Sequence, residues 1–467
     1  MKYLMIDFGS TYTKLTAVDT EVGDIIATAS HFTTVETDIT NGYENALKVL
    51  ESKIGPTTFD KIIACSSAAG GLKMAAIGLV QELTVEAAKR VCLGAGAKVD
   101  LVYSNHLNKS EIKDIVNKGI DIVLLAGGTD GGNSECVLYN AKALAKYFSE
   151  NNVKIPIVYA GNKSCIDDIE EIFDEYKING HIVENVMPRL NILNIDSARQ
   201  KIREIFLLNI IVAKGIKKIE KVIDKVVLPT PEAVLTAANL LSKGYMKEEG
   251  LGEIIVLDIG GATTDFYSMS SPHPKRSDII IKGLEETYAK RTVEGDLGMR
   301  YSSLGVVASL TAEQKALINE EYNLDIESEA QNLRANVEMI PTTEHQHLVD
   351  SIIAKVCVDK ATTRHVGKME KVFTPLGIAY NQTGKDLSDV KVVIGTGGVL
   401  INSKNPSDIL SSVVVNPKYI EELRPKDPNY YLDSDYILAS MGLLSSEEPV
   451  LALQIMKKHL QKLNWKQ

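Results

Sequence analysis

A short motif that contains Asp, Gly and Thr occurs twice in the sequence, once at the N-terminus and once past the middle. The first copy runs Asp7-Phe8-Gly9-Ser10-Thr11-Tyr12-Thr13-Lys14, and the second runs Asp258-Ile259-Gly260-Gly261-Ala262-Thr263-Thr264-Asp265. A carboxylate can hold Mg²⁺, directly or through water, and can orient a water molecule for attack. Lys14 adds a point charge that suits phosphate oxygens. The two copies therefore predict chemistry on a phosphate, assisted by Mg²⁺.

Each copy of the motif lies between two apolar segments. Residues 3–6 and 15–18 flank the first copy, and residues 254–257 and 266–269 flank the second. An apolar run, a tight glycine turn and a second apolar run are typical of a β-hairpin. The glycine loop of a P-loop or Rossmann unit leads into a helix instead. We therefore expect two hairpins that face each other across a cleft and hold a polyphosphate with the backbone N–H groups of their turns.

Paired hairpins of the form Asp-x-Gly-[Ser/Gly]-x-x-Thr resemble the two phosphate motifs of the actin, hexokinase and seventy-kilodalton chaperone superfamily of ATPases. Residues 392–398 resemble the adenosine motif of that superfamily, and residues 230–235 and 438–443 resemble its two connecting helices. The five motifs follow the superfamily's order and span almost the whole chain. The resemblance implies an α/β fold, an actin-like two-lobed ATPase with an inserted α/β domain.

The resemblance carries a set of site residues onto this sequence. Asp7, Asp258 and Lys14 are the expected catalytic residues, and both aspartates are expected to hold Mg²⁺, through water. The expected nucleotide-binding residues are Gly9, Ser10, Thr11, Thr13, Gly260, Gly261, Thr263, Thr264, Gly395, Thr396, Gly397 and Gly398. The alternative is a pair of ordinary Asp-Gly hairpin turns, but a chance turn would not be duplicated with the later motifs in order.

Four segments together resemble a narrower family. Residues 7–14, 65–71, 125–132 and 291–300 are similar to the glutamate mutase accessory protein L family. The resemblance implies an ATP-dependent accessory or reactivating factor, similar to a chaperone, for an adenosylcobalamin-dependent mutase such as glutamate mutase. It also implies ATP and Mg as cofactors, mutase subunits as partners, and weak ATPase activity coupled to closure of the lobes.

Two other functions stay open at this point. A small-molecule kinase of the same superfamily would need a catalytic Asp at a sugar or acid pocket, and no such segment is recognisable. A nucleotide-binding assembly scaffold would differ by failing to turn over ATP. Cobalamin itself is expected in the partner, because the Asp-x-His-x-x-Gly motif of cobalamin binding is absent from the sequence.

The first connecting helix departs from the superfamily's pattern. Related chaperones carry a carboxylate before the Pro of this helix, and that carboxylate helps to place the water. Here Thr230 precedes Pro231, and Glu232 is one residue further along. We therefore expect slow hydrolysis, or Asp258 as the main residue that orients water, or a switch with little turnover.

The composition is that of an ordinary globular protein, with 45% hydrophobic and 24% charged residues. A net charge of −10 argues against nucleic acid as a partner. The five cysteines are scattered without a Cys-x-x-Cys pair, which favours buried thiols over metal ligands. No apolar run reaches the ~18 residues of a spanning helix, and no leader pattern opens the chain. We therefore expect a cytoplasmic protein without membrane contact.

The order of the patterns predicts five segments. Residues 1–60 form the first lobe with hairpin one, 61–187 the inserted α/β domain, and 188–249 the rest of the first lobe with its connecting helix. Residues 250–435 form the second lobe with hairpin two and the adenosine motif, and 436–467 the C-terminal connecting region. The insert is inferred from short apolar strands that alternate with helical patterns. Its glycine-rich segment, residues 127–132, is either a tight turn or a contact for a phosphate, a partner or a cofactor.

Overall fold

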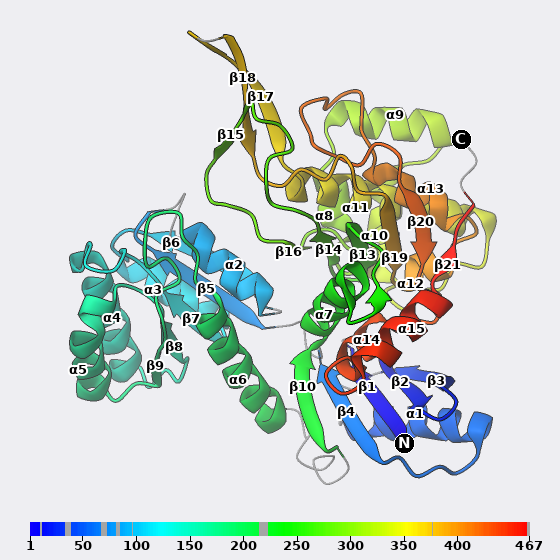
Figure 1. The fold of residues 1–467 in the computed structure, drawn as a ribbon, viewed down its shortest axis with the longest axis horizontal. Coiled ribbons are helices and arrows are strands. Elements are labelled where there is room, and N and C mark those ends of the chain that lie inside the picture. Colours follow the sequence, from blue (N-terminus) through cyan, green and yellow to red (C-terminus); the bar gives the residue numbers. More distant parts are fainter. Residues whose placement is uncertain are drawn as a thin grey trace. The chain divides into compact units, whose positions relative to one another are not determined.

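The computed structural model describes residues 1–9, 12–32, 39–66, 72–80, 85–95, 97–213, 223–375 and 377–464. These residues form two compact units. Unit 1 contains Met1–Ala233 and Gly283–Glu285, and unit 2 contains Val234–Lys282 and Glu286–Gln467. Figure 1 labels the helices and strands of both units. None of the helices in the described ranges combines the length and hydropathy of a membrane-spanning segment.

The first sheet of unit 1 is mixed and carries hairpin one. Its strand order is β10-β4-β1-β2-β3, in which β2 runs antiparallel to both of its neighbours while β4 and β10 run parallel to β1. The central strand β1 is buried from Tyr3 to Phe8, as expected for an apolar run with neighbours on both sides. The elements are β1 (Lys2–Phe8), β2 (Tyr12–Asp19), β3 (Asp24–Phe32), β4 (Lys61–Ser66), β10 (Lys225–Pro229) and helix α1 (Ile39–Ile54), which packs on β2 and β3.

The second sheet of unit 1 is entirely parallel, with the order β6-β5-β7-β8-β9. Numbered in chain order, the strands follow the doubly wound arrangement 2-1-3-4-5. The order in which successive strands are added to the sheet changes side between β5 and β7, while all strands stay parallel. Its strands are β5 (Lys73–Gly78), β6 (Lys98–Ser104), β7 (Ile122–Leu125), β8 (Ile157–Tyr159) and β9 (Gly180–Ile182). Its helices are α2 (Glu86–Gly94), α3 (Lys109–Asn117), α4 (Glu135–Glu150), α5 (Ile166–Tyr176) and α6 (Asp196–Ala213), with a short 3-10 turn η2 (Lys163–Cys165). The predicted alternation of parallel strands and helices is present, and its assignment to a separate inserted domain remains a prediction.

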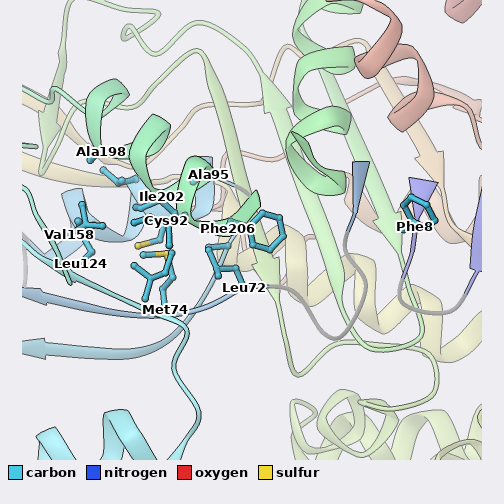
Figure 2. Close-up of a cluster of buried hydrophobic side chains, with 14 of the residues drawn as sticks. Phe8, Leu72, Met74, Cys92, Ala95, Leu124, Val158, Ala198, Ile202 and Phe206 are labelled. Carbon is cyan, nitrogen blue, oxygen red and sulfur yellow. The ribbon is translucent and has the colours of Figure 1, made fainter. Parts of the chain in front are cut away.

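A buried cluster joins this sheet to its covering helices. Figure 2 shows Cys92 of α2 and Ile202 of α6 beside Met74, Leu124 and Val158, which come from β5, β7 and β8. All five side chains are fully buried. Burying each of these larger side chains contributes roughly 1.5–3 kcal/mol, so the cluster holds α2 and α6 on this face of the sheet.

Strand β4 belongs to the first sheet, where it lies between β1 and β10. The second sheet begins only at Lys73, in β5. A boundary at residue 61 would therefore divide the sheet that carries hairpin one. The sequence could not reveal this, because a short apolar run such as β4 could belong to either sheet. The division of the chain into five segments remains a prediction.

The main sheet of unit 2 repeats the pattern of the first sheet. Its order is β16-β14-β13-β19-β20-β21, in which β14 is antiparallel to β13 and β16, while β19 and β20 run parallel to β13. The strands are β13 (Ile254–Ile259), β14 (Thr264–Met269), β16 (Ala289–Glu294), β19 (Val392–Thr396), β20 (Asn429–Leu432) and β21 (Gln461–Lys462). Hairpins one and two occupy the same position in two sheets of the same order and direction. The predicted actin-like α/β fold class is therefore confirmed.

Helices and a small third sheet complete unit 2. The connecting helix α7 (Thr230–Lys243) enters it, followed by the short pair β11 (Gly244–Tyr245) and β12 (Glu248–Glu249). Its other helical elements are α8 (Ser303–Ala308), α9 (Ala312–Tyr322), α10 (Ile326–Ala335), α11 (Glu344–His365), α12 (Gly398–Ile401), α13 (Pro406–Leu410), η4 (Ser411–Val413), α14 (Leu438–Leu444) and α15 (Pro449–His459). The third sheet has the order β15-β18-β17, with β15 (Ile279–Lys282), β17 (Lys368–Thr374) and β18 (Gly377–Thr383).

Candidate functional site

Hairpin one closes with a tight turn at Gly9. Its N–H donates to the Tyr12 carbonyl at 3.1 Å, and a Cβ at Gly9 would lie 2.5 Å from that oxygen, so only glycine fits. The ladder pairs Asp7 with Lys14. The side chain of Thr13 is fully buried, which removes its hydroxyl from the exposed face of the turn. The predicted residues Ser10 and Thr11 lie outside the described residues.

The carboxylate of Asp7 lies where three parallel strands end together. β1 and β4 pair Asp7 with Cys65, and helix α7 begins directly after β10, with Thr230. The Thr230 hydroxyl donates to Asp7 Oδ1 at 2.6 Å, and Lys14 Nζ lies 3.6 Å from Asp7 Oδ2. Carboxyl ends of parallel strands are the usual place for ligands in sheets of this kind. The structure thus brings together two of the three predicted catalytic residues, Asp7 and Lys14.

Two further residues complete the surroundings of Asp7, and neither was predicted to contact it. Cys65 Sγ lies 3.5 Å from Asp7 Oδ1, and burial, followed by the charge of Asp7, raises the pKa of this thiol well above its usual range. Cys65 is therefore a neutral neighbour of the carboxylate. Thr230, noted in the sequence only for lacking a carboxylate, holds Asp7 directly.

Glu232 does not replace the missing carboxylate of the connecting helix. It is buried and forms an ion pair with Arg203 of α6, whose Nε donates to Glu232 Oε2 at 2.8 Å. Burial of the guanidinium, followed by the charge of Arg199, lowers the pKa of Arg203. The geometry therefore gives Glu232 the role of fixing α7 against α6 within unit 1.

Hairpin two has a turn of the same form. The Gly260 N–H donates to the Thr263 carbonyl at 2.9 Å, and Met299 N–H donates to the Gly260 carbonyl at 3.0 Å. A Cβ at Gly298 would lie 2.4 Å from the Ala262 carbonyl carbon. Gly298 must therefore be glycine, because the segment after β16 passes directly under the turn. This contact explains part of the 291–300 motif.

The acidic residues of hairpin two differ in their surroundings. Asp258 is half-buried and pairs with Asp265 across the hairpin and with Thr396 of β19. Asp265 is buried and accepts a hydrogen bond from Arg291 Nε at 2.7 Å. The buried ion pair compensates the charge of Asp265, and Asp258 is the less buried carboxylate of this hairpin.

The hydroxyls of hairpin two contact groups of the protein itself. The Thr264 hydroxyl is fully buried and donates to the Leu297 carbonyl at 2.8 Å. The Thr263 hydroxyl is 3.4 Å from Asp265 Oδ2. The backbone of the turn is engaged as well, because the Gly261 carbonyl accepts from the N–H groups of Arg300 and Tyr301, both at 2.8 Å.

Gly295 and Asp296, within the 291–300 motif, make structural contacts. Both Asp296 oxygens accept from Arg364 of α11, at 2.6 and 2.8 Å, and Arg364 also binds Glu294. The Gly295 carbonyl accepts from Ser302 at 3.0 Å. A bidentate arginine pair of this kind fixes the segment against α11.

The predicted adenosine motif lies against hairpin two. Gly397 has φ of +107°, and a Cβ there would lie 2.4 Å from the Ile259 carbonyl, so the end of β13 requires glycine at this point. A Cβ at Gly395 would meet Leu400, whereas the Cβ position of Gly398 is open. The glycines thus let β19 and its turn approach the end of hairpin two.

Thr396 is occupied by a contact that the sequence did not reveal. Its buried hydroxyl donates to Asp433 Oδ2 at 3.2 Å. Asp433 also accepts from the backbone N–H groups of Ile437 and Leu438, at 2.9 and 3.2 Å, at the start of α14. Asp433 lies four residues before the N-cap Ile437, so the usual capping pattern does not identify it in the sequence.

The glycine-rich loop after β7 is held by its own hydrogen bonds. A Cβ at Gly128 would lie 2.3 Å from the Asn133 carbonyl oxygen, so a tight turn requires this glycine. Asp130 Oδ1 accepts from the Lys163 N–H at 3.0 Å and from the Asn185 side chain at 2.9 Å. These contacts hold the tight turn in place. Residues 131–135 of the loop are exposed.

The sequence and the fold were compared with known proteins. The family model described as MutL protein matches residues 3–460. Protein MutL of Clostridium tetanomorphum is 51% identical over 464 residues, which cover 98% of this chain and 99% of that protein. Two solved structures, a ligand-bound xylulose kinase and a gluconate kinase from Lactobacillus acidophilus, are each 11% identical. They cover 99% of this chain and 93% and 92% of their own, with TM-scores of 0.34 and 0.35.

Proposed function

Because this chain belongs to the MutL protein family, we propose that it is an ATP-dependent accessory factor that reactivates an adenosylcobalamin-dependent mutase such as glutamate mutase. The family predicted from the four motifs is the one that the family model matches. One observation carries the ATP-dependent part of the proposal. Two Asp-Gly hairpins occupy equivalent positions in two sheets of the same order, and each presents an Asp at the end of its central strand.

In unit 1, we assign magnesium and phosphate binding to Asp7 and Lys14. Both oxygens of the Asp7 carboxylate have a neighbour within the protein, Thr230 on Oδ1 and Lys14 on Oδ2. The carboxylate is therefore held in one orientation, which suits a Mg²⁺ ion that keeps its own waters. Lys14 is only partly buried and can turn its ammonium group toward a phosphate.

In unit 2, we assign the orientation of the attacking water to Asp258. Its neighbour Asp265 is paired with Arg291, and Asp258 is the less buried of the two carboxylates. A carboxylate that accepts a proton or orients water contributes about 10²–10⁴-fold to a rate. Gly398, with nothing within 4 Å of its Cβ position, leaves room for a phosphate or a base to approach the backbone.

The connecting helix supports slow turnover. It starts at Thr230, whose hydroxyl is bonded to Asp7, and Glu232 is engaged by Arg203. No carboxylate of the first turn of α7 is thus available to place the water. A slow ATPase suits a factor in which ATP drives a conformational cycle, because the nucleotide-bound state must last long enough to act on a partner.

The proposal predicts that the chain binds Mg·ATP. Isothermal titration calorimetry with ATP in the presence of Mg²⁺ is expected to give a saturable heat of binding, which falls when Mg²⁺ is removed with a chelator. An Asp7→Asn, Asp258→Asn double variant is the control, since it keeps the shape of both hairpins and removes both charges. Absence of any heat, together with an unchanged melting temperature, would refute nucleotide binding.

A further inference from the structure

The segment after β16, residues 298–302 and called here the supporting segment, binds three consecutive carbonyls of the hairpin-two turn. The Gly260 and Gly261 carbonyls accept from its backbone N–H groups, at 3.0 and 2.8 Å. The Ala262 carbonyl accepts from the Ser302 hydroxyl at 2.6 Å. All three carbonyls therefore point toward the supporting segment.

The N–H groups of the same peptides point the other way. Every peptide bond of the described residues is trans, so the C=O of one residue and the N–H of the next have opposite directions. The N–H groups of Gly261, Ala262 and Thr263 therefore lie on the side of the turn away from the supporting segment. Within the ranges that the structure describes, no protein group accepts from them. Successive N–H groups on one side of a turn form an anion-binding concavity.

Ser302 binds the turn rather than its own helix. It is the N-cap residue of α8, where a serine hydroxyl usually accepts from the first N–H groups of the helix. Ser302 makes no such capping bond. Its hydroxyl contributes instead to holding the Ala262 carbonyl, and with it the peptide that carries the Thr263 N–H.

The supporting segment is itself fixed by Arg300. The buried Arg300 guanidinium binds both oxygens of Asp350 in α11, at 2.9 Å each, and donates to the Met339 carbonyl at 3.0 Å. A bidentate arginine–carboxylate pair adds geometric precision as well as energy. The backbone N–H of Arg300, which binds the Gly261 carbonyl, is therefore held in place by α11.

We propose that Ser302 and the Arg300–Asp350 pair are positioning residues, which keep the N–H groups of the hairpin-two turn directed at a phosphate of ATP. They act through the turn and do not touch the nucleotide. Donors that are already oriented need no reorganisation when a charged group arrives. This role also accounts for Arg300, the last residue of the 291–300 motif. The inference rests on the proposed function, because it requires ATP as the ligand of the turn.

The first test changes Ser302 in the full-length chain. Ser302→Ala removes the bond to the Ala262 carbonyl, and Ser302→Thr keeps a hydroxyl at the same place. Ser309→Ala is the matched control, because the Ser309 hydroxyl also donates to a carbonyl at 2.6 Å, that of Val306. Calorimetry measures the affinity for Mg·ATP and for adenosine, which carries the base and ribose but no phosphate. Melting temperature reports whether each variant is folded.

The second test removes the buried ion pair as a whole. The Arg300→Met, Asp350→Leu double variant replaces two charges with apolar side chains of similar size, which folded proteins often tolerate without loss of stability. A single substitution would instead leave one buried charge unpaired. The same two ligands and the melting temperature are measured.

Ser302→Ala is expected to weaken the binding of Mg·ATP about fivefold, the scale of one hydrogen bond, and the double variant by at least as much. Adenosine affinity is expected to stay unchanged, and Ser302→Thr and Ser309→Ala to bind Mg·ATP like the wild type. Unchanged Mg·ATP affinity in Ser302→Ala and in the double variant would overturn the inference and leave the proposed function intact. An equal loss of adenosine and Mg·ATP binding would also overturn it, since the residues would then only stabilise the fold. If the wild type bound no Mg·ATP, the proposed function would fail together with this inference.

Discussion

Replacing Asp258 with Asn is expected to lower the rate of ATP turnover by about 100-fold while changing the affinity for Mg·ATP less than about threefold. The amide keeps the shape of the side chain and its place opposite Asp265 and Thr396, but it cannot accept a proton from water. Single-turnover release of phosphate and calorimetry measure the two quantities separately. A large effect is expected because the carboxylate of α7, Glu232, is paired with Arg203 and cannot orient the water in place of Asp258.

Asp389→Asn is the matched control, because it removes a negative charge of unit 2 at a 61% exposed side chain. It is expected to leave both turnover and affinity unchanged. If Asp258→Asn lowered affinity as strongly as turnover, Asp258 would be a binding residue rather than the residue that orients water. If neither quantity changed, the assignment of hairpin two would be wrong.

Replacing Lys14 with Ala is expected to weaken the binding of Mg·ATP by about 10- to 100-fold. The loss of a charge-assisted hydrogen bond to phosphate costs about 1.5–3 kcal/mol, which corresponds to one or two factors of ten. Thr230→Val tests the other side of Asp7, since it removes the 2.6 Å hydrogen bond and leaves every charge in place. Its effect is expected to be smaller, about 1 kcal/mol or fivefold.

Lys53→Ala controls for the loss of a lysine in unit 1, because Lys53 Nζ donates to the Thr28 carbonyl at an exposed position. Calorimetry with ATP and with ADP measures each variant. An unchanged affinity in Lys14→Ala would show that the Lys14–Asp7 pair only stabilises hairpin one. In that case the melting temperature would fall while nucleotide binding stayed the same.

The hairpins, the class of fold and the parallel insert could be predicted because their signals are local. An Asp, a glycine turn and two flanking apolar runs lie within about 16 residues, and strands that alternate with helices indicate a parallel sheet wherever they occur. The start of the insert could not be predicted with the same accuracy. β4 and β5 are both short apolar strands, and only their pairing partners assign them to different sheets.

The contacts that surround the candidate residues are long-range, and no local pattern announces them. Thr230 and Asp7 are 223 residues apart in sequence, and Thr396 and Asp433 are 37 apart. The occupied hydroxyls of Thr264 and Thr396 follow from packing against segments that join the site only in the folded chain. The third sheet of unit 2, formed by β15, β18 and β17, was also absent from the sequence prediction, because β15 pairs with β18 across nearly 100 intervening residues.

Release of a bound cobalamin tests the central claim most directly. Glutamate mutase is loaded with cyanocobalamin, which lacks the adenosyl group and blocks the enzyme, and is mixed with the chain and Mg·ATP. After rapid filtration, the absorbance of free cobalamin measures how much has left the mutase. Release is expected only when the chain and Mg·ATP are both present, and it is expected to slow about 100-fold with Asp258→Asn. Equal release with and without ATP, or no release under any condition, would contradict an ATP-dependent reactivating factor.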